Sequence, residues 1–212
     1  MDLLTFTTES SAPEPALLGE LRVATWQQTR HGRLMSDVQT GRTVAMASRM
    51  IRPLVALELG TFTGYGTLCL LEGLDPSGTL HTVERNDELF ALQDKFWCRA
   101  EGHERIHRHH ANVMDVLDNW DVPTNGRIDL AFVDADKQGT MDHLEGLLPL
   151  MAEGGWMLFD NTWWSGTLWG ANAATGTKPD ALRALHTRLR EDASLRAVTL
   201  PVGDGLTAVQ KA

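Results

Sequence analysis

One segment constrains the fold of this chain more than any other: Val55-Ala-Leu-Glu-Leu-Gly-Thr-Phe-Thr-Gly-Tyr-Gly66. An apolar strand pattern carries an acid just before a glycine-rich turn, and a helical pattern follows. This arrangement is typical of nucleoside-cofactor sites at the carboxyl end of a strand. A dinucleotide fingerprint has a single residue between its first two glycines, whereas three residues separate Gly60 from Gly64. Glu58 would repel a pyrophosphate and suits a cationic or hydroxyl-rich ligand. An ordinary strand-to-helix turn is the alternative.

From Leu54 onward, apolar runs alternate with helical patterns. We expect strands at 54–59, 79–84, 105–110, 128–134 and 154–160, and helices at 64–74, 87–101, 113–119, 138–151 and 179–192. Such alternation predicts a mostly parallel sheet covered on both faces. Two last apolar runs, 196–202 and 206–210, flank Gly203-Asp204-Gly205, which favours a tight reversal. The sequence therefore predicts a doubly wound α/β fold with a mostly parallel, seven-stranded sheet that ends in an antiparallel hairpin.

The first 52 residues differ from this α/β core. Residues 1–13 are polar, and we expect them to form a loose arm. Apolar residues at near-helical spacing, from Leu17 to Trp26 and from Val38 to Met50, predict two helices that end before Pro53. A chain of 212 residues is expected to form one domain. We therefore predict a single domain over 1–212, with an N-terminal arm and helices over 1–52 and the core over 53–212.

Charge and cysteine content exclude several classes of partner. The net charge of -9 argues against nucleic acid and against an anionic membrane, because phosphate binding needs clustered Lys and Arg. Cys69 and Cys98 lie in apolar helical patterns and are expected to be buried free thiols. The first residues lack the pattern of a signal peptide, and no segment reaches the roughly 20 apolar residues of a membrane span. We expect a cytoplasmic protein.

Three acids end apolar strand patterns. Glu84 ends the run 79–84, where it can accept both ribose hydroxyls of a bound nucleoside; a solvent-exposed acid is the alternative. Asp134 and Asp160 end two strongly apolar runs. A carboxylate carried by a buried strand is costly unless it is paired or binds a metal. If the first, fourth and fifth strands are neighbours, both acids lie beside the glycine loop. Helix capping is the alternative role for Asp134 and Asp160.

Residues around these acids predict a metal site and a base. Asp134, Asp160 and the amide oxygen of Asn161 are hard oxygen ligands, which suit Mg²⁺ or another divalent cation. Zinc favours His or Cys instead. Lys137 follows Asp134 by three residues. A cation beside a metal does not help to bind it, so we expect Lys137 to act as a base. A surface lysine paired with Asp136 is the alternative.

Tryptophans crowd the segment that follows Asp160 and Asn161. Trp163, Trp164 and Trp169 lie within nine residues of Asp160 in the sequence. Flat apolar side chains beside a metal favour walls for an aromatic substrate. Dimer contacts or loop packing explain the same residues equally well, and both alternatives stay open.

Together these motifs resemble the cation-dependent O-methyltransferases, the family that includes catechol and caffeoyl-CoA O-methyltransferases. The resemblance covers about residues 35–211. Its motifs are Glu58-Leu-Gly-Thr-Phe-Thr-Gly-Tyr65, Phe132-Val-Asp-Ala-Asp-Lys137, Asp160-Asn161 with Trp164-Ser-Gly166, and Leu200-Pro-Val-Gly-Asp-Gly-Leu206. The resemblance implies the methyltransferase form of the doubly wound fold, S-adenosylmethionine as the methyl donor, and a homodimer.

The resemblance also assigns roles to residues. Asp134, Asp160 and Asn161 fall on metal-ligand positions and Lys137 on the catalytic lysine. Met35 and Ser36 resemble the N-terminal cofactor lid. The cofactor-binding residues that it implies are Met35, Glu58, Gly60, Thr61, Gly64, Tyr65, Gly66, Glu84, Arg85, Ala111, Asp134 and Ala135. Two of them depart from the family pattern: Gly66 stands where a serine often touches the methionine tail, and Arg85 stands where many members have an acid or an apolar residue.

We therefore expect a Mg²⁺-dependent O-methyltransferase that acts on a small aromatic molecule with two adjacent hydroxyls, most simply a catechol. A nicotinamide-dependent oxidoreductase on the same kind of sheet is one alternative. Such an oxidoreductase would have a different glycine spacing. This alternative also does not explain why Asp134, Asp160 and Asn161 occur together. A non-catalytic protein that binds S-adenosylmethionine is the other alternative.

Overall fold

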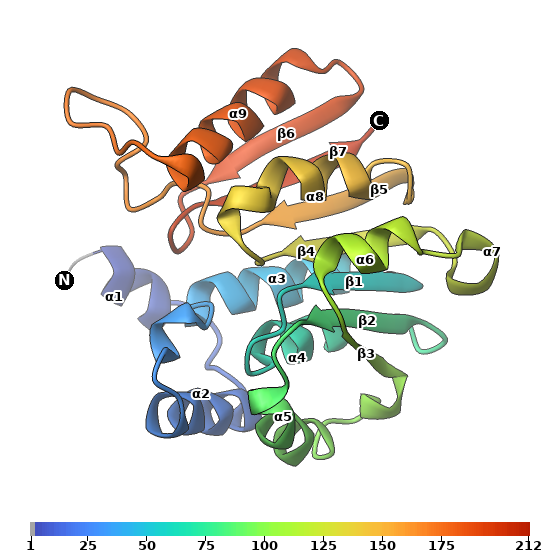
Figure 1. Cartoon of the computed structure of the whole chain (residues 1–212). Coiled ribbons are helices and arrows are strands. Elements are labelled where there is room, and N and C mark those ends of the chain that lie inside the picture. The colour runs from blue at the N-terminus through green and yellow to red at the C-terminus, as the bar shows by residue number, and fades with distance from the viewer. Residues whose placement is uncertain (1–2) are drawn as a thin grey trace.

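The structure is a computed structural model, and it describes residues 3–212. One seven-stranded sheet forms its centre, in the order β3-β2-β1-β4-β5-β7-β6 (Figure 1). The first five strands run parallel, and β7 runs antiparallel to β5 and β6. The predicted fold is therefore confirmed. The strands are β1 (Val55–Leu59), β2 (Thr79–Glu84), β3 (Ile106–His110), β4 (Ile128–Val133), β5 (Met151–Phe159), β6 (Leu195–Leu200) and β7 (Leu206–Lys211).

Helices cover both faces of the sheet (Figure 1). In β1, Ala56 packs into a core with residues of α2–α5, whereas Leu57 and Leu59 pack into a second core with residues of α6, α8 and α9. A strand that alternates between two apolar layers has apolar residues on both faces, as β1 does except at Glu58. The helices are α1 (Leu3–Glu9), α2 (Ala16–Gln28), α3 (Val38–Ile51), α4 (Tyr65–Leu71), α5 (Phe90–Trp97), α6 (Val113–Asp118), α7 (Val122–Asn125), α8 (Thr140–Leu147) and α9 (Thr177–Glu191).

Some predicted elements differ from the structure. The predicted loose arm contains the helix α1, and the side-chain amide of Gln39 donates to the Thr7 hydroxyl; residues 1 and 2 of that arm lie outside the described residues. The helix predicted over 138–151 ends at Leu147, because Met151 already pairs with Ile128 as the start of β5. The short helix α7 was not predicted. Cys69 is buried as expected, but Cys98 is exposed at the end of α5.

Across residues 3–212, none of the helices is long and apolar enough to cross a membrane.

A stack of histidines joins β3, at the edge of the sheet, to β2. His81 is buried, and its Nδ1 shares a hydrogen bond of 2.9 Å with Nε2 of His109. Its ring also stacks on His107 at 5.1 Å and meets the edge of Trp120 at 4.9 Å, between ring centroids. Burial, with the neighbouring His109 and His107, lowers the pKa of His81 to about 4. Between about pH 4 and pH 6.5, His81 is therefore neutral in the folded protein but protonated in the unfolded chain.

The histidine stack predicts an acid-sensitive stability. Because the pKa of His81 is lower in the folded state, its contribution is present at neutral pH and is lost as pH falls from 6.5 through about 4. Between pH 7.5 and 4.5, the parent should lose about 2 kcal/mol more unfolding free energy than His81→Leu. Urea unfolding at the two pH values measures this difference, with exposed His103→Gln as the control. Equal losses in parent and His81→Leu would contradict the assignment.

Candidate functional site

A large pocket opens at the carboxyl ends of the central strands. Gly60, Glu84, Asp134 and Asp160 follow or end β1, β2, β4 and β5, and all four line it. The order of the sheet reverses here, because β2 lies on one side of β1 and β4 on the other. Doubly wound sheets bind their ligands in this crevice. Its volume of about 1870 Å³ exceeds the roughly 300–1,000 Å³ of a typical single-ligand pocket, so it has room for two molecules.

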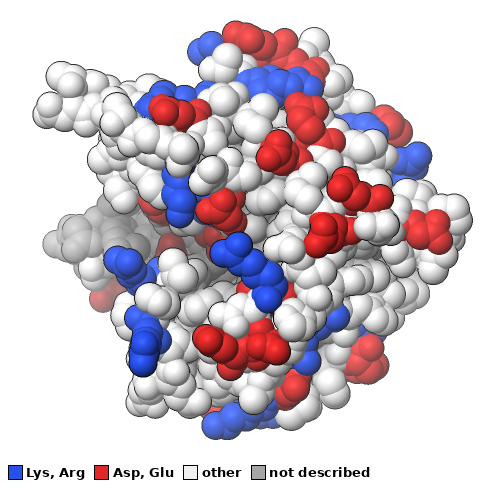
Figure 2. Space-filling model, viewed as in Figure 1, with Lys and Arg blue, Asp and Glu red and all other residues white. Residues whose placement is uncertain are grey.

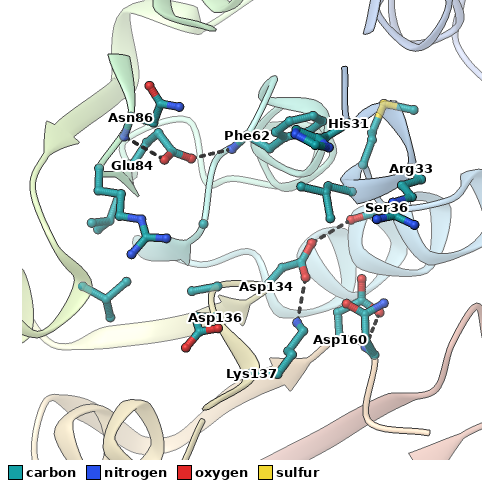
Figure 3. A pocket seen from close by; sticks show the side chains of 18 of the residues that line it. His31, Arg33, Ser36, Phe62, Glu84, Asn86, Asp134, Asp136, Lys137 and Asp160 are labelled. Carbon is teal, nitrogen blue, oxygen red and sulfur yellow. Dashed lines mark hydrogen bonds and ion pairs between the residues drawn. The ribbon is translucent and has the colours of Figure 1, made fainter. Parts of the chain in front are cut away.

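The glycine loop and Glu84 form one wall. Gly60 has φ +96°, and a Cβ there would lie 2.5 Å from the carbonyl oxygen of Asp134, so only glycine lets this loop approach β4. The Glu84 carboxylate accepts from the amide of Phe62 and from the amide of Asn86, each at 2.9 Å. These bonds hold the carboxylate at the pocket wall and leave lone pairs for a ligand (Figure 3).

Glu58 lies beneath this loop. It is 1% exposed, and burial raises its pKa to about 8, against the opposing effect of hydroxyl donors from Thr67 and Thr82. It borders a small cavity beside the main pocket, together with Met35, Thr61, Tyr65 and Gly66. A Cβ at Gly66 would lie 2.4 Å from Oε1 of Glu58. The departure at this position therefore has a steric reason, since a serine would collide with the buried carboxyl.

Gly64 and Tyr65 have structural roles in the part of the chain that is described. Gly64 begins α4 with φ +85°, and a Cβ there would lie 2.2 Å from Nε1 of Trp97. The Tyr65 hydroxyl donates to Oε1 of Glu14 at 2.6 Å, and its ring packs against Gly41. Gly64 therefore does not line the main pocket, and Tyr65 borders only the small cavity.

The remaining predicted cofactor residues lie along the pocket. Arg85 follows Glu84, and the amide of Ala111 donates to the carbonyl of Glu84 at 3.2 Å. Ala135 follows Asp134. Met35, Arg85, Ala111 and Ala135 all line the pocket.

Asp134 and Asp160 lie at the ends of paired strands, where Val133 of β4 is opposite Phe159 of β5. Asp160 is 2% exposed and accepts from the backbone amide of Asn161 at 2.7 Å. Burial and the neighbouring Asp134 carboxylate raise the pKa of Asp160 well above its usual range. Two carboxylates held together in this way favour a cation between or beside them.

The donor set fits a hard divalent cation. Two carboxylates and the amide oxygen of Asn161, which also lines the pocket, are the oxygen ligands that Mg²⁺ prefers. Asn161 has φ +54°, a left-handed conformation that asparagine tolerates. Within residues 3–212, no group of three or more His, Cys, Asp or Glu side chains is arranged to hold a metal. A site here would therefore depend on the amide of Asn161 and on oxygens from water or a ligand.

Lys137 faces Asp134 across the pocket floor (Figure 3). Its Nζ lies 2.8 Å from Oδ1 of Asp134, and its side chain is 12% exposed. The alternative interpretation, a surface lysine paired with Asp136, is wrong. Asp136 pairs instead with Lys178 at 3.6 Å. The hydroxyl of Ser36 donates to the other oxygen of Asp134 at 3.3 Å, so the N-terminal segment also reaches this carboxylate.

The turn between β6 and β7 holds the segment that follows Asn161. The amide of Trp163 donates to the carbonyl of Asp204 at 2.8 Å, and the amide of Ser165 donates to the Asp204 side chain. A Cβ at Gly205 would lie 2.5 Å from Cβ of Trp163. Trp164 and Ser165 have positive φ angles of 53° and 54°, which cost energy in non-glycine residues. Asp204 supplies hydrogen bonds that compensate for this strain.

Two of the three predicted substrate tryptophans reach the pocket. Trp163 and Trp164 line it. Trp169 does not: it is 56% exposed, and its ring lies 5.7 Å from that of His186, between centroids. Sequence proximity to Asp160 suggested all three, but the chain turns away after Gly166 toward α9.

Other lining residues were not predicted. His31 and Arg33 come from the turn between α2 and α3, Asp204 from the last hairpin, and His143 and Lys178 from α8 and α9. None belongs to a strand-end motif. Lys and Arg side chains border a hollow near the middle of the face seen in Figure 2.

Comparison with known proteins gives the same fold and a family. A model of the O-methyltransferase family matches residues 8–212. The chain is 31% identical to the catechol O-methyltransferase domain-containing protein 1 of Mus musculus, over 95% of this chain and 76% of that protein. It is 30% identical to caffeoyl-CoA O-methyltransferase 2 of Zea mays, over 93% of this chain and 77% of that protein.

Solved structures share the architecture. The O-methyltransferase TomG from Streptomyces achromogenes, in complex with SAM, superposes with a TM-score of 0.88 at 21% identity and covers 98% of this chain and 95% of its own. The SAH-bound methyltransferase PaMTH1 from Podospora anserina has a TM-score of 0.87 at 23% identity, with coverage of 99% and 94%.

The Asp204 contacts predict that this residue positions the tryptophan segment. Asp204→Ala should lower the unfolding free energy by about 0.5–1.5 kcal/mol, because the side-chain acceptor of the Ser165 amide is lost. It should also increase acrylamide quenching of tryptophan fluorescence. Asp204→Asn keeps a side-chain oxygen, so its unfolding free energy and its acrylamide quenching should both be close to those of the parent. Asp180→Ala, on the exposed side of α9, serves as the control. Unchanged quenching in Asp204→Ala would contradict the positioning role.

Proposed function

The chain belongs to the O-methyltransferase family, and we propose that it methylates one hydroxyl of a small aromatic substrate with two adjacent hydroxyls, using Mg²⁺ or another divalent cation. It is an S-adenosylmethionine-dependent O-methyltransferase of the caffeoyl-CoA and catechol type. The observation that carries the proposal is the paired Asp134 and Asp160, beside Lys137 and Asn161, in a pocket large enough for two molecules.

The cofactor half of the pocket lies around Glu84. Its carboxylate is held by two backbone amides and has free lone pairs, which supports hydrogen bonds to ribose hydroxyls. The carboxylates of Glu84 and Asp134 line the pocket near the glycine loop, and both help to raise the pKa of the buried Glu58 to about 8. The negative charge of Glu84 and Asp134 favours a positively charged sulfonium ligand over a pyrophosphate.

Asp134, Asp160 and Asn161 are the residues that would hold the cation. When bound, a divalent cation would bind both substrate oxygens and lower the pKa of the reacting hydroxyl. We assign Lys137 as the group that receives the hydroxyl proton. Because methyl transfer needs an aligned oxygen and methyl group, positioning by the pocket walls supplies much of the rate.

The flat side chains of Trp163 and Trp164 support an aromatic substrate, because both line the pocket beside Asn161. The nicotinamide alternative is not supported, since the family is one of methyltransferases. A non-catalytic role would not explain why Asp134, Asp160 and Lys137 are held together in the pocket. The homodimer, the cytoplasmic location and the lack of nucleic-acid or membrane partners stay predictions.

A metal-binding test examines the acid pair directly. Asp160→Asn keeps the shape of the side chain but removes one charge, so its affinity for Mg²⁺ should fall at least about 10-fold, in line with the loss of a charged ligand. Calorimetry measures the affinity, and methylation of catechol should stop in excess EDTA. Asp136→Asn also lies in the pocket lining and should bind Mg²⁺ like the parent. Full turnover in EDTA would refute the metal assignment.

A second test concerns the proton acceptor. Lys137→Met keeps much of the side-chain length and removes the amine, so turnover on catechol should fall by about 10²–10⁴-fold. The affinity for S-adenosylmethionine should stay close to that of the parent. A nitrocatechol, which ionises more readily, should be affected less. Lys178→Met provides the matched control, because Lys178 lines the pocket but pairs with Asp136. Parental turnover by Lys137→Met would reassign Lys137 to a purely structural ion pair.

A further inference from the structure

Two arginines at the rim of the pocket have no acidic partner in the part of the chain that the structure describes. Arg30 and Arg33 line the pocket, both are exposed, and neither forms an ion pair with any described residue. Nine other arginines do form ion pairs with Asp or Glu. In a chain with a net charge of -9, free arginines beside a ligand pocket are a specific feature that the methyl transfer itself does not use.

The turn that carries these arginines is held in place. The amide of Leu34 donates to the carbonyl of His31 at 2.8 Å, and the amide of Met35 donates to the carbonyl of Gly32 at 3.2 Å. Gly32 is buried, and a Cβ there would lie 3.0 Å from the ring of Trp26. The two guanidinium groups therefore extend from a packed turn rather than from a loose terminus.

The turn lies on the side of the pocket that carries the acid pair. Figure 3 shows Arg33 beside Ser36, on the same side as Asp160 and opposite Glu84 and Asn86. Ser36 itself donates to Asp134 at 3.3 Å, so this segment borders the acid pair. Arg85, the other arginine of the lining without an acidic partner in the described chain, directly follows Glu84 and belongs to the cofactor side.

We propose that Arg30 and Arg33 bind an anionic group, a carboxylate or a phosphate, that the aromatic substrate carries away from its reacting hydroxyls. The planar guanidinium group matches both anions through paired hydrogen bonds. Glu84, Asp134 and Asp160 would repel such a group from the strand ends at the pocket floor, so the two arginines also set the direction in which the substrate enters. This inference rests on the proposed function and adds the charge of the substrate.

The test compares two ligands that differ by one charge. Caffeate and its methyl ester share the ring with two adjacent hydroxyls, but only caffeate carries a carboxylate. Calorimetry with Mg²⁺ and S-adenosylhomocysteine present gives the Kd of each for the parent and for the double variant Arg30→Gln/Arg33→Gln. Caffeoyl-CoA, in which the carboxyl is a thioester and the anions are phosphates, is the third ligand.

We expect the double variant to bind caffeate or caffeoyl-CoA about 10-fold more weakly, as for loss of a charge-assisted pair at a partly exposed site. Its affinity for the methyl ester should change less than about twofold, because no charge is involved. Arg33→Lys should recover part of the affinity for the anionic ligands. Salt at about 0.5 M should reduce the preference of the parent for the anionic ligands over the ester. If the double variant loses more affinity for caffeate, the recognised anion is a carboxylate. If it loses more affinity for caffeoyl-CoA, the recognised anion is a phosphate. Arg196, on β6, is exposed and has no acidic partner among residues 3–212. The variant Arg196→Gln removes one positive charge away from the pocket and should bind all three ligands like the parent.

Three results would overturn the inference. The parent could bind neither anionic ligand more tightly than the ester, or the double variant could bind all three ligands more weakly by the same factor. The third result is a loss of affinity for S-adenosylhomocysteine alone, which would assign the arginines to the carboxylate of the cofactor. Turnover of the methyl ester by the parent tests the proposed function separately, because that substrate has no anionic group. Circular dichroism melts verify that the variants fold.

Discussion

Backbone hydrogen bonds at the ends of the parallel strands position the whole site. The amide of Gly60 donates to the carbonyl of Val83 at 3.1 Å, that of Asp134 to Leu59 at 2.8 Å, and that of Asp160 to Val133 at 3.1 Å. Each of these three residues is thus one position beyond its strand, and its amide is bonded to the last or next-to-last residue of the neighbouring strand. The backbone hydrogen bonds of the sheet therefore extend to these residues. Their side chains are carried by the rigid edge of the sheet and not by flexible loops.

That edge concentrates acidic side chains in a poorly hydrated region, where their charged forms are disfavoured. Burial raises the pKa of Glu58 to about 8 and also raises the pKa of Asp160, whose neighbour is the Asp134 carboxylate. Lys137 offsets part of the charge through its ion pair with Asp134. Burial of acids in this way lowers the free energy of unfolding when no cation is bound. Binding of cations to the folded state raises it. The same electrostatics therefore favour a sulfonium cofactor and a divalent ion.

The pocket walls come from segments that are distant in sequence. The turn around Asp204 bonds to Trp163 on one side, and a Cβ at Gly203 would lie 2.4 Å from the carboxylate of Asp37 on the other. Asp37 caps α3 through the amides of Gln39 and Thr40, immediately after Ser36. The last hairpin thus connects the tryptophan segment with the N-terminal segment that reaches Asp134. Displacement of this turn would disturb both walls together.

The sequence by itself determined the strand-end chemistry. The positions of Glu84, Asp134 and Asp160 after apolar runs, and of the glycines after β1, follow from local pattern, because parallel strands bring their carboxyl ends to one edge. Local pattern also identified Lys137, three residues from Asp134. Only the tertiary structure decided the rest. Packing, rather than sequence distance, brought Arg33 and Asp204 to the pocket, turned Trp169 away from it, and made Gly64 a contact of Trp97.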